Sequence, residues 1–309
     1  MNPCHILDCN QLRIFLIIWE LRNITKAASC LNLSQPTVST HLKALEEQLG
    51  TLLFERTSKG LEPTRAARIL YPHARRIMRL NRTVIDEIAA LNGENSGYLD
   101  IGASNIPGQY LLPKLLAKFK ADRWAVDISL KISDTAAVIR QVDAGEVEIG
   151  LVGAIINNRR VQFQECFDDE LLLIVGNNHR LSRQKSITLE EVLAQPLVIR
   201  EKGSGTRLTI EMEFEKMGLN MDRGKVLMEL GSTEAIRQAV KAGIGCAFLS
   251  KRAVIDDISC GLLHPVQVVG LDIRRKFYII RSKNRVLSPV AKSFIKFVNE
   301  AAQREKSGV

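Results

Sequence analysis

The sequence predicts an all-α head with a helix-turn-helix, a long linker helix and a C-terminal α/β domain. Residues 8–63 hold three short stretches whose apolar residues recur at helical spacing, and residues 64–91 hold one long stretch of this kind. From Gly97 onward, apolar runs of strand length alternate with helical patterns, which is typical of an α/β domain. The polar segment 92–97, rich in Gly and Asn, is predicted to be a hinge before a second domain at 98–309.

Composition permits several classes of partner and argues against a membrane protein. The net charge of +9 permits a nucleic-acid partner, yet residues 1–91 hold only 12 Lys and Arg against 8 Asp and Glu. The apolar runs are too short to cross a bilayer and the first residues do not form a signal peptide, so we expect a cytoplasmic protein. The six cysteines lack zinc spacing, which predicts reduced, mostly buried thiols and no bound metal.

The head contains two consecutive helical patterns joined by a very short turn. We expect Thr25 to cap the first of these helices and Ser34 to cap the second, where Pro36 fits because its missing N–H costs nothing in a first turn. The second helix has an inner apolar stripe at positions 38, 42, 45 and 49. Such a tight helix pair, packed on a preceding helix, is a helix-turn-helix.

The outward side of the last helix is polar and free of acid, which a helix that enters the major groove requires. These outward residues are Gln35, Thr37, Ser39, Thr40 and Lys43. The alternative is an ordinary amphipathic surface helix. A solvated helix usually mixes Glu with Lys from its start, whereas residues 21–45 contain no Asp or Glu. The pattern therefore favours nucleic-acid binding.

A basic turn follows the predicted helix-turn-helix. Arg56, Ser58 and Lys59 precede Gly60, which is a turn signal. A basic β-turn beside a recognition helix is a wing, whose expected partners are phosphates.

The long helical stretch at 64–91 begins after a predicted cap at Thr64 and repeats every seven residues. Its stripe consists of Leu70, Ile77, Val84 and Leu91, with Ala74 and Ile88 one turn further along. A heptad stripe predicts a partner helix, although the stretch could instead pack on its own domain. We favour a dimer because half-sites related by two-fold symmetry need two reading heads.

The second domain is predicted to contain a mainly parallel sheet, because strands and helices alternate. The predicted strands are 98–103, 126–132, 147–152, 171–175, 197–200, 225–230, 244–248 and 276–281. Ligands of such sheets lie beyond the carboxyl ends of the strands, at helix N-termini. Small polar residues at four of these places predict a cleft for a small anion: Ser104, Asn105, Thr135, Ser204, Gly205, Thr206, Ser232 and Thr233. Alternatively, each Ser or Thr is simply a helix cap. Arg200 and Arg207 flank one of these turns and could either steer an anion or form surface ion pairs.

The head also resembles a known family. The run Leu33-Ser34-Gln35-Pro36-Thr37-Val38-Ser39, followed by Leu45-Glu46, Leu49-Gly50, Leu53-Phe54-Glu55-Arg56 and Pro63-Thr64, is closely similar to LysR-type transcriptional regulators. The match covers about 60 residues without gaps. One departure is Thr40, where many members carry Arg or His, so the base that this position reads is left open.

This resemblance implies the rest of the architecture. It implies a winged helix-turn-helix at 8–63, a dimerising linker helix at 64–91, and an effector domain of two lobes that resembles a periplasmic binding protein. Lobe I would span about 98–161 and 267–309, and lobe II about 162–266. It also implies binding to a dyad-symmetric promoter site, pairing of dimers into tetramers, and RNA polymerase as a candidate partner. Similarity to branches that act on sulfur or selenium metabolism and on carbon fixation implies a sulfate-like oxyanion or a small carboxylate as the effector.

Together, these observations assign a DNA-binding surface. Gln35, Pro36, Ser39 and Thr40 are expected to face bases. Residues expected to face phosphates or to support the surface are Thr25, Ser34, Thr37, Lys43, Arg56, Ser58 and Lys59.

Two other classes of protein fit this sequence less well than a ligand-responsive regulator. An enzyme with a DNA-binding head is not favoured, because the five histidines are scattered and no GxSxG motif, paired carboxylates or cofactor motif occurs. A solute-binding protein is not favoured either, because the first 91 residues would have no purpose in it and we find no export signal.

Overall fold

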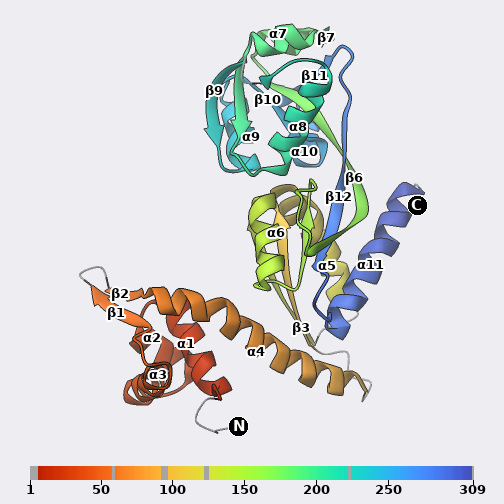
Figure 1. The fold of residues 1–309 in the computed structure, drawn as a ribbon. Helices are drawn as coiled ribbons and strands as arrows, with labels where there is room; N and C mark the ends of the chain where they lie inside the picture. The colour runs from red at the N-terminus through yellow and green to blue at the C-terminus, as the bar shows by residue number, and fades with distance from the viewer. Residues whose placement is uncertain (1–5, 58–59, 92–96, 122–124, 222–223, 308–309) are drawn as a thin grey trace. The chain divides into compact units, whose positions relative to one another are not determined.

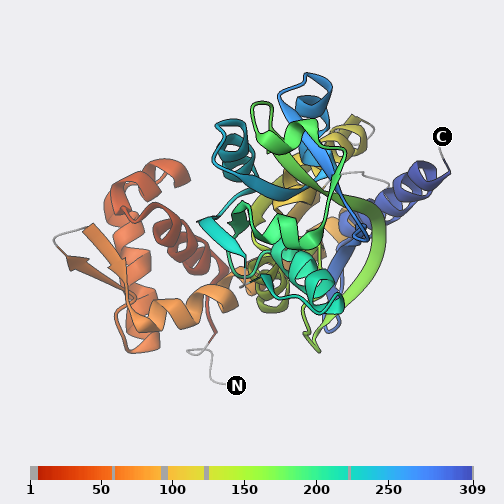
Figure 2. The ribbon, with the colours of Figure 1, turned by 90° about the horizontal axis from the view of Figure 1, so that it is seen from above.

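The computed structural model describes residues 6–57, 60–91, 97–121, 125–221 and 224–307 (Figures 1 and 2). The chain divides into two compact units, one of residues 1–92 with 144–146, and one of residues 93–143 with 147–309. In the described part of the chain, no helix is both long and apolar enough to cross a membrane.

The first unit consists of helices and one hairpin. Its elements are α1 (Cys9–Leu21), α2 (Ile24–Leu31), α3 (Gln35–Leu49), β1 (Phe54–Thr57), β2 (Gly60–Pro63) and α4 (Arg65–Leu91). The Ser34 side chain accepts a hydrogen bond from the Thr37 N–H, so its predicted cap is confirmed. The predicted cap at Thr25 is wrong: the Asn23 side chain accepts from the Lys26 N–H, and Thr25 lies one residue inside α2. Asn and Thr side chains can both accept the capping hydrogen bond, so residue type alone did not decide between Asn23 and Thr25. The position at which α2 begins decided it.

A compact aliphatic core holds α1, α2, α3 and the hairpin together. Leu12, Phe15, Val38 and Leu45 are buried in it, whereas Leu49, the last residue of the predicted stripe, is 38% exposed and lies outside this core. In α3, Glu46 turns back to accept hydrogen bonds from the N–H groups of Leu53 and Phe54, at 2.6 and 3.3 Å. This contact fixes the chain between the helix and the hairpin.

The linker helix α4 is divided into a buried beginning and an exposed remainder. Thr64 Oγ1 accepts from the Ala67 N–H, as predicted. Leu70 and Ala74 are buried in the core of the first unit, so the first part of the heptad stripe packs on its own domain. From Ile77 onward most large apolar side chains are exposed, namely Ile77, Leu80, Val84, Ile85 and Ile88, whereas Met78 is half-buried and packs against the same core. The first part of the stripe thus packs on its own domain, and only the second part is left exposed for a partner helix.

The second unit is built on a ten-stranded sheet with helices on both faces. The sheet runs in the order β4-β3-β5-β12-β6-β10-β8-β9; β11 also pairs with β6, and β7 pairs with β11. The strands are β3 (Gly97–Ser104), β4 (Val126–Ser133), β5 (Ile149–Val152), β6 (Val161–Gly176), β7 (Ser186–Ile187), β8 (Pro196–Arg200), β9 (Lys225–Leu230), β10 (Cys246–Ser250), β11 (Leu263–Val268) and β12 (Ile273–Ser282). The helices are a π-helical turn η2 (Pro107–Leu111), α5 (Leu112–Ala121), α6 (Thr135–Ala144), a 3-10 turn η3 (Arg180–Arg183), α7 (Leu189–Leu193), α8 (Gly205–Lys216), α9 (Thr233–Lys241), α10 (Lys251–Ser259) and α11 (Pro289–Lys306).

The prediction of a mainly parallel sheet holds only at the two ends of this order. β4-β3-β5 and β10-β8-β9 are parallel, but β6 pairs antiparallel with β12, β10 and β11, and β12 pairs antiparallel with β5. The sequence predicted only 171–175 of β6, because its first half alternates buried and exposed residues and lacks a continuous apolar run. β6 and β12 are the strands shared by the two lobes.

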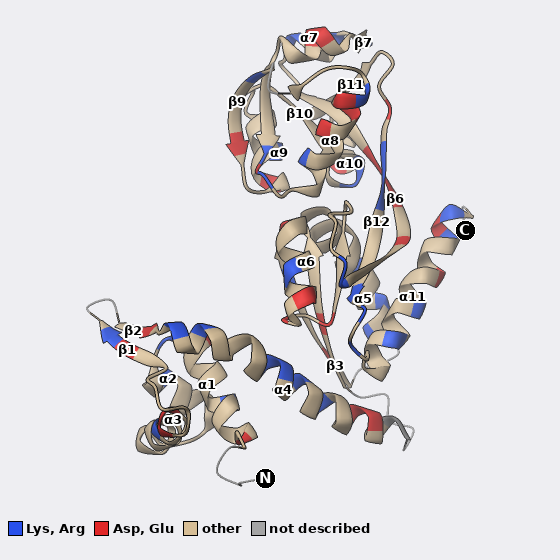
Figure 3. Ribbon diagram, viewed as in Figure 1, with Lys and Arg blue, Asp and Glu red and all other residues tan. Residues whose placement is uncertain are grey.

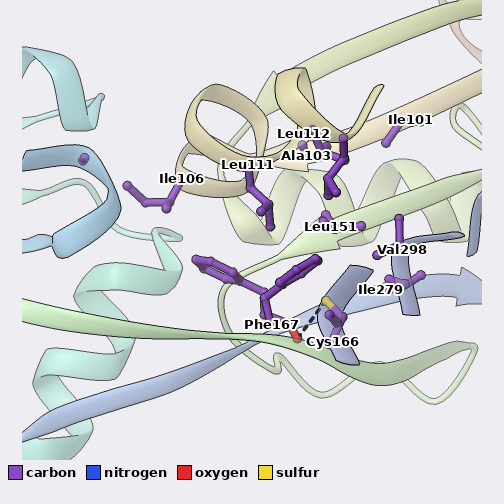
Figure 4. Packing of buried hydrophobic residues seen from close by; sticks show 14 of the residues in the cluster. Ile101, Ala103, Ile106, Leu111, Leu112, Leu151, Cys166, Phe167, Ile279 and Val298 are labelled. Carbon is purple, nitrogen blue, oxygen red and sulfur yellow. Dashed lines mark hydrogen bonds between the residues drawn. The ribbon is translucent and has the colours of Figure 1, made fainter. Parts of the chain in front are cut away.

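The cysteines are less buried than predicted. Cys166 and Cys246 are buried, whereas Cys30 and Cys260 are exposed and Cys9 is half-buried. Cys166 lies beside Phe167 in the largest apolar core, which also contains Ile106 and Leu111 (Figure 4). Ile106 directly follows the predicted pocket residues Ser104 and Asn105, so this core supports one wall of that site.

Candidate functional site

The first candidate surface is the outer face of α3. Gln35, Pro36, Thr40 and Lys43 are exposed. Ser39, in contrast, is half-buried. This face is polar, and its first acidic residue is Glu46. The first turns of the helix can therefore present hydroxyl and amide groups to an anionic groove, whereas the Lys43 ammonium group lies 3.6 Å from the carboxylate of exposed Glu47.

Two short contacts organise the first turn of α3. Ser34 Oγ and Thr37 Oγ1 lie 2.8 Å apart, which holds both hydroxyl groups at the helix N-terminus. Thr25 Oγ1 donates to Gln35 Oε1 at 3.3 Å, which links α2 to α3 and orients the Gln35 amide. Thr25 thus supports the predicted reading residue from the neighbouring helix.

The predicted wing is the hairpin of β1 and β2. Its register pairs Phe54 with Pro63 and Thr57 with Gly60. The predicted wing residues Ser58 and Lys59 lie outside the described residues. Arg56 is exposed on β1. Lys or Arg residues lie on β1 and at the start of α4 (Figure 3).

The second candidate site is a pocket of about 220 Å³ in the second unit, where lobe I meets lobe II. It contains six of the eight predicted effector residues, and five that were not predicted. The lining residues are Ser104, Asn105, Ile106, Asp134, Thr135, Gly153, Arg200, Ser204, Gly205, Thr206 and Arg275. The helices α6 and α8 and the turn η2 all begin close to this lining, so their positive ends face the same space.

An unpartnered hydroxyl group lies in this pocket. Thr135 is 1% exposed, and its Oγ1 has no hydrogen-bond partner in the described structure. A Cβ placed on Gly205 would lie 2.6 Å from Thr135 Oγ1, so any side chain at 205 would obstruct that hydroxyl. The Ala136 N–H donates to the Gly203 carbonyl oxygen at 3.4 Å, which joins the lobes at this edge. A buried polar group without a partner is costly, so this hydroxyl is a strong candidate to bind a ligand.

Arg275 supplies a positive charge that the sequence prediction missed. It lies near the start of β12, and its Nη1 donates to Thr206 Oγ1 at 3.0 Å. Its Nε donates to Asp169 Oδ2 at 2.8 Å, and Asp169 Oδ1 accepts from Ser250 Oγ at 2.6 Å. Burial lowers the pKa of Arg275, and the charge of Asp169 opposes that shift. The prediction considered only residues that follow the carboxyl ends of strands, whereas Arg275 lies near the amino end of β12.

The two arginines that flank the Gly203–Thr206 turn are already paired. Arg200 makes two 2.7 Å hydrogen bonds to Glu201, and its Nη1 donates to Thr233 Oγ1 at 2.9 Å. Arg207 binds Glu211 and Glu229, each at 2.7 Å. Burial lowers the pKa of Arg207, but the hydrogen bonds to these carboxylates raise it, and the net shift is upward. Both arginines are buried, so these are not surface pairs, and only Arg200 reaches the pocket.

Two predicted effector residues lie away from the pocket lining. Ser232 caps α9 by accepting from the Ala235 N–H, and Thr233 is connected to the pocket only through Arg200. Asp134, which was not predicted, lies beside Thr135 and accepts from the Ala137 N–H at 2.7 Å. An Asp directly before a helix is a common cap, so this signal was present in the sequence, but Asp134 was not predicted.

Two protein-family models match this chain, one over the first unit and one over the second. Residues 9–68 match the bacterial regulatory helix-turn-helix protein, lysR family, and residues 92–303 match the LysR substrate binding domain. The chain belongs to the LysR family of transcriptional regulators. It is therefore a DNA-binding regulator with an effector-binding domain, and its relatives are regulators rather than enzymes.

Among these LysR-family relatives is the RuBisCO operon transcriptional regulator of Allochromatium vinosum, 30% identical over 96% of this chain and 97% of that protein. The transcriptional activator CmpR of Synechocystis is 31% identical over 94% of each chain. The fold matches full-length CbnR in complex with its target DNA, with a TM-score of 0.71, 22% identity and coverage of 96% of this chain and 100% of that one. The regulatory domain of Synechocystis CcmR in complex with 2-PG matches 67% of this chain and 97% of that one, with a TM-score of 0.61 and 24% identity.

Proposed function

We propose that this LysR-family chain binds dyad-symmetric operator DNA as a dimer, or as a pair of dimers, in the cytoplasm. The observation that carries the proposal is the acid-free outer face of α3. In this proposal Gln35, Pro36, Ser39 and Thr40 face base edges, since amide and hydroxyl groups near a helix N-terminus suit the major groove. Phosphate contacts and support come from Thr25, Ser34, Thr37, Lys43, Arg56, Ser58 and Lys59.

The dimer would form through the second part of α4. Ile77, Leu80, Val84, Ile85 and Ile88 are between 37% and 66% exposed in the single chain. Exposed apolar side chains at helical spacing are stabilised when a second helix covers them. Residues 8–63 would then act as the reading head, 64–91 as the dimerising helix, 92–97 as the hinge and 98–309 as the effector domain.

The effector of this domain is proposed to be a small anion, bound at the pocket that contains Thr135 and Arg275. Three observations support it: an unpartnered buried hydroxyl, a buried guanidinium and the positive ends of helices. The pocket is small, which favours a small acid over a drug-sized ligand. The names of the relatives favour a carboxylated or phosphorylated metabolite linked to carbon fixation over sulfate.

Selection from a random duplex pool with the full chain tests the DNA proposal. We expect a consensus with two-fold symmetry and an affinity that falls steeply as salt rises. Gln35→Ala should reduce the preference for the consensus over a scrambled duplex, because a good bidentate base contact contributes about 1–3 kcal/mol of discrimination. Equal affinity of the wild-type chain for both duplexes would refute sequence-specific binding. Supershifted complexes with RNA polymerase on the selected duplex would identify polymerase as a partner.

Calorimetry with sulfate, phosphate, acetate and 2-phosphoglycolate tests the effector proposal. Thr135→Val keeps the shape of the side chain and removes the unpartnered hydroxyl, so it should weaken binding of whichever anion binds. Ser104→Ala and Thr206→Val should have the same direction of effect. Ser232→Ala is the matched control, because Ser232 lies away from the pocket lining. Equal affinity in Thr135→Val, Ser104→Ala and Thr206→Val would refute this site.

A further inference from the structure

A second pocket lies in the first unit, between the start of α2, the start of α3 and the hairpin. It is open to solvent and has an empty volume of about 610 Å³. Two arginines, Arg22 and Arg56, line it together with Thr25 and Gln35. Among its described lining residues there is no Asp or Glu.

The hairpin contributes a cation and no carboxylate to this lining. Arg56 pairs in register with Leu61, and Thr57 with Gly60, and all four line the pocket. The neighbouring pair, Glu55 with Glu62, is not part of the lining. The hairpin therefore adds positive charge to the pocket without a carboxylate beside it.

Arg22 has an unusual backbone for its residue type. It is the C-cap of α1 and has φ 50° and ψ 26°, in the left-handed region. Gly is the common residue at such helix ends because a Cβ is unfavourable there. A non-glycine residue in this region is a reason to look for a function of the side chain.

The Arg22 side chain is held by a column of aromatic rings. Its Cζ lies 4.5 Å from the centroid of the Trp19 ring, and Trp19 stacks on Tyr71 with centroids 4.4 Å apart and planes at 22°. Arg75 also contacts Tyr71: its Cζ lies 5.8 Å from the centroid of that ring, and its Nη1 donates to the Tyr71 hydroxyl at 3.2 Å. Arg22 Nη1 is covered from solvent and has no hydrogen-bond partner in the described structure.

We propose that Arg22 and Arg56 hold one phosphate of the DNA backbone in this pocket, with Arg22 positioned by the Trp19–Tyr71 stack. The inference rests on the proposed DNA-binding function of α3 and adds a contact that fixes how α3 enters the groove. Gln35 lines the same pocket and is hydrogen-bonded to Thr25, so a phosphate held there would lie beside the first reading residue. Phosphate contacts of this kind fix register without reading sequence.

Arg22→Gly tests the proposal because its effects on stability and on DNA binding differ. The substitution removes the guanidinium and suits the left-handed backbone, so the melting temperature should stay within a few degrees of wild type or rise. Affinity should fall about tenfold on both the selected duplex and a scrambled duplex, and the slope of log K against log salt should drop by about 0.9 for each reading head. Arg22→Lys should retain most of the slope.

Two variants serve as matched controls. Asn32→Gly places glycine at the other left-handed helix end of this unit that carries a side chain, where φ is 53°, and should leave affinity unchanged. Arg13→Ala removes an exposed arginine of α1 that does not line the pocket, and should leave the salt slope unchanged. An unchanged affinity and slope in Arg22→Gly would overturn the phosphate site alone. A slope that falls equally in Arg13→Ala would overturn it too, since general charge would then explain the loss. Failure of the wild-type chain to prefer any duplex would overturn the proposed function and this inference together.

Discussion

Removing Asp169 should destabilise the second unit strongly, because Asp169 is the carboxylate partner of a buried guanidinium. The exposed fractions of the Asp169 and Arg275 side chains are 0% and 5%, and Arg275 Nη2 lies 2.7 Å from Asp169 Oδ2. In Asp169→Ala, Arg275 keeps its hydrogen bond to Thr206 but loses the carboxylate. Breaking a buried pair by removing one partner costs about 3–5 kcal/mol. In a domain of this size that corresponds to a fall of about 6–20 °C in the melting temperature.

Differential scanning calorimetry of the full chain measures this loss in the transition of the second unit. The control is Asp272→Ala, which breaks a pair of the same chemistry: Asp272 and Arg274 are 2.9 Å apart but 61% and 77% exposed. An exposed pair contributes about 0–1 kcal/mol, so that variant should melt close to wild type.

A double variant separates pair loss from general disruption of β6. Asp169→Leu with Arg275→Met replaces both charges by apolar groups and should recover most of the stability, because no unpaired charge remains. The reasoning would be refuted by a loss below about 1 kcal/mol in Asp169→Ala, or by a double variant no more stable than the single one.

Three further outcomes are expected. Ser34→Ala should lower the stability of the first unit by about 1 kcal/mol in urea unfolding, since it removes the cap of α3; no change would deny the cap its role. Burial raises the pKa of Cys166 to about 11 and of Cys246 to about 12, so iodoacetamide at pH 8 should alkylate exposed Cys260 well before either of them, as peptide mass mapping would show; equal rates would contradict that burial. Hydrogen bonds from a glutamine and an arginine of α9 lower the pKa of Glu234, so its stabilising effect is present above the unfolded pKa and is lost as pH falls through the folded value. Urea midpoints between pH 3 and 6 should therefore fall less in Glu234→Gln than in wild type, and parallel curves would argue against this effect.

Some features of this protein are determined by neighbours along the chain, and these could be predicted from the sequence. The short turn between α2 and α3, the Ser34 cap and the acid-free face of α3 depend on the residue types within one or two turns of helix. The polar turns at Ser104, Thr135 and Gly203–Thr206 each follow an apolar run, so the sequence places them at strand ends. That six predicted residues share one pocket depends on the antiparallel strands β6 and β12, which set β8 opposite in direction to β3.

Only the tertiary structure decided which distant residues complete these features. Asp169 and Arg275 are 106 positions apart, and they meet because β6 and β12 pair antiparallel. The half-exposed first part of β6 gave no apolar run to reveal that pairing. In α4, the heptad spacing is the same before and after Ile77, yet the first part is buried by the core of the head and the second is exposed. Periodicity records which side chains share a face of a helix, whereas the surface that covers that face depends on how the chain folds back on itself.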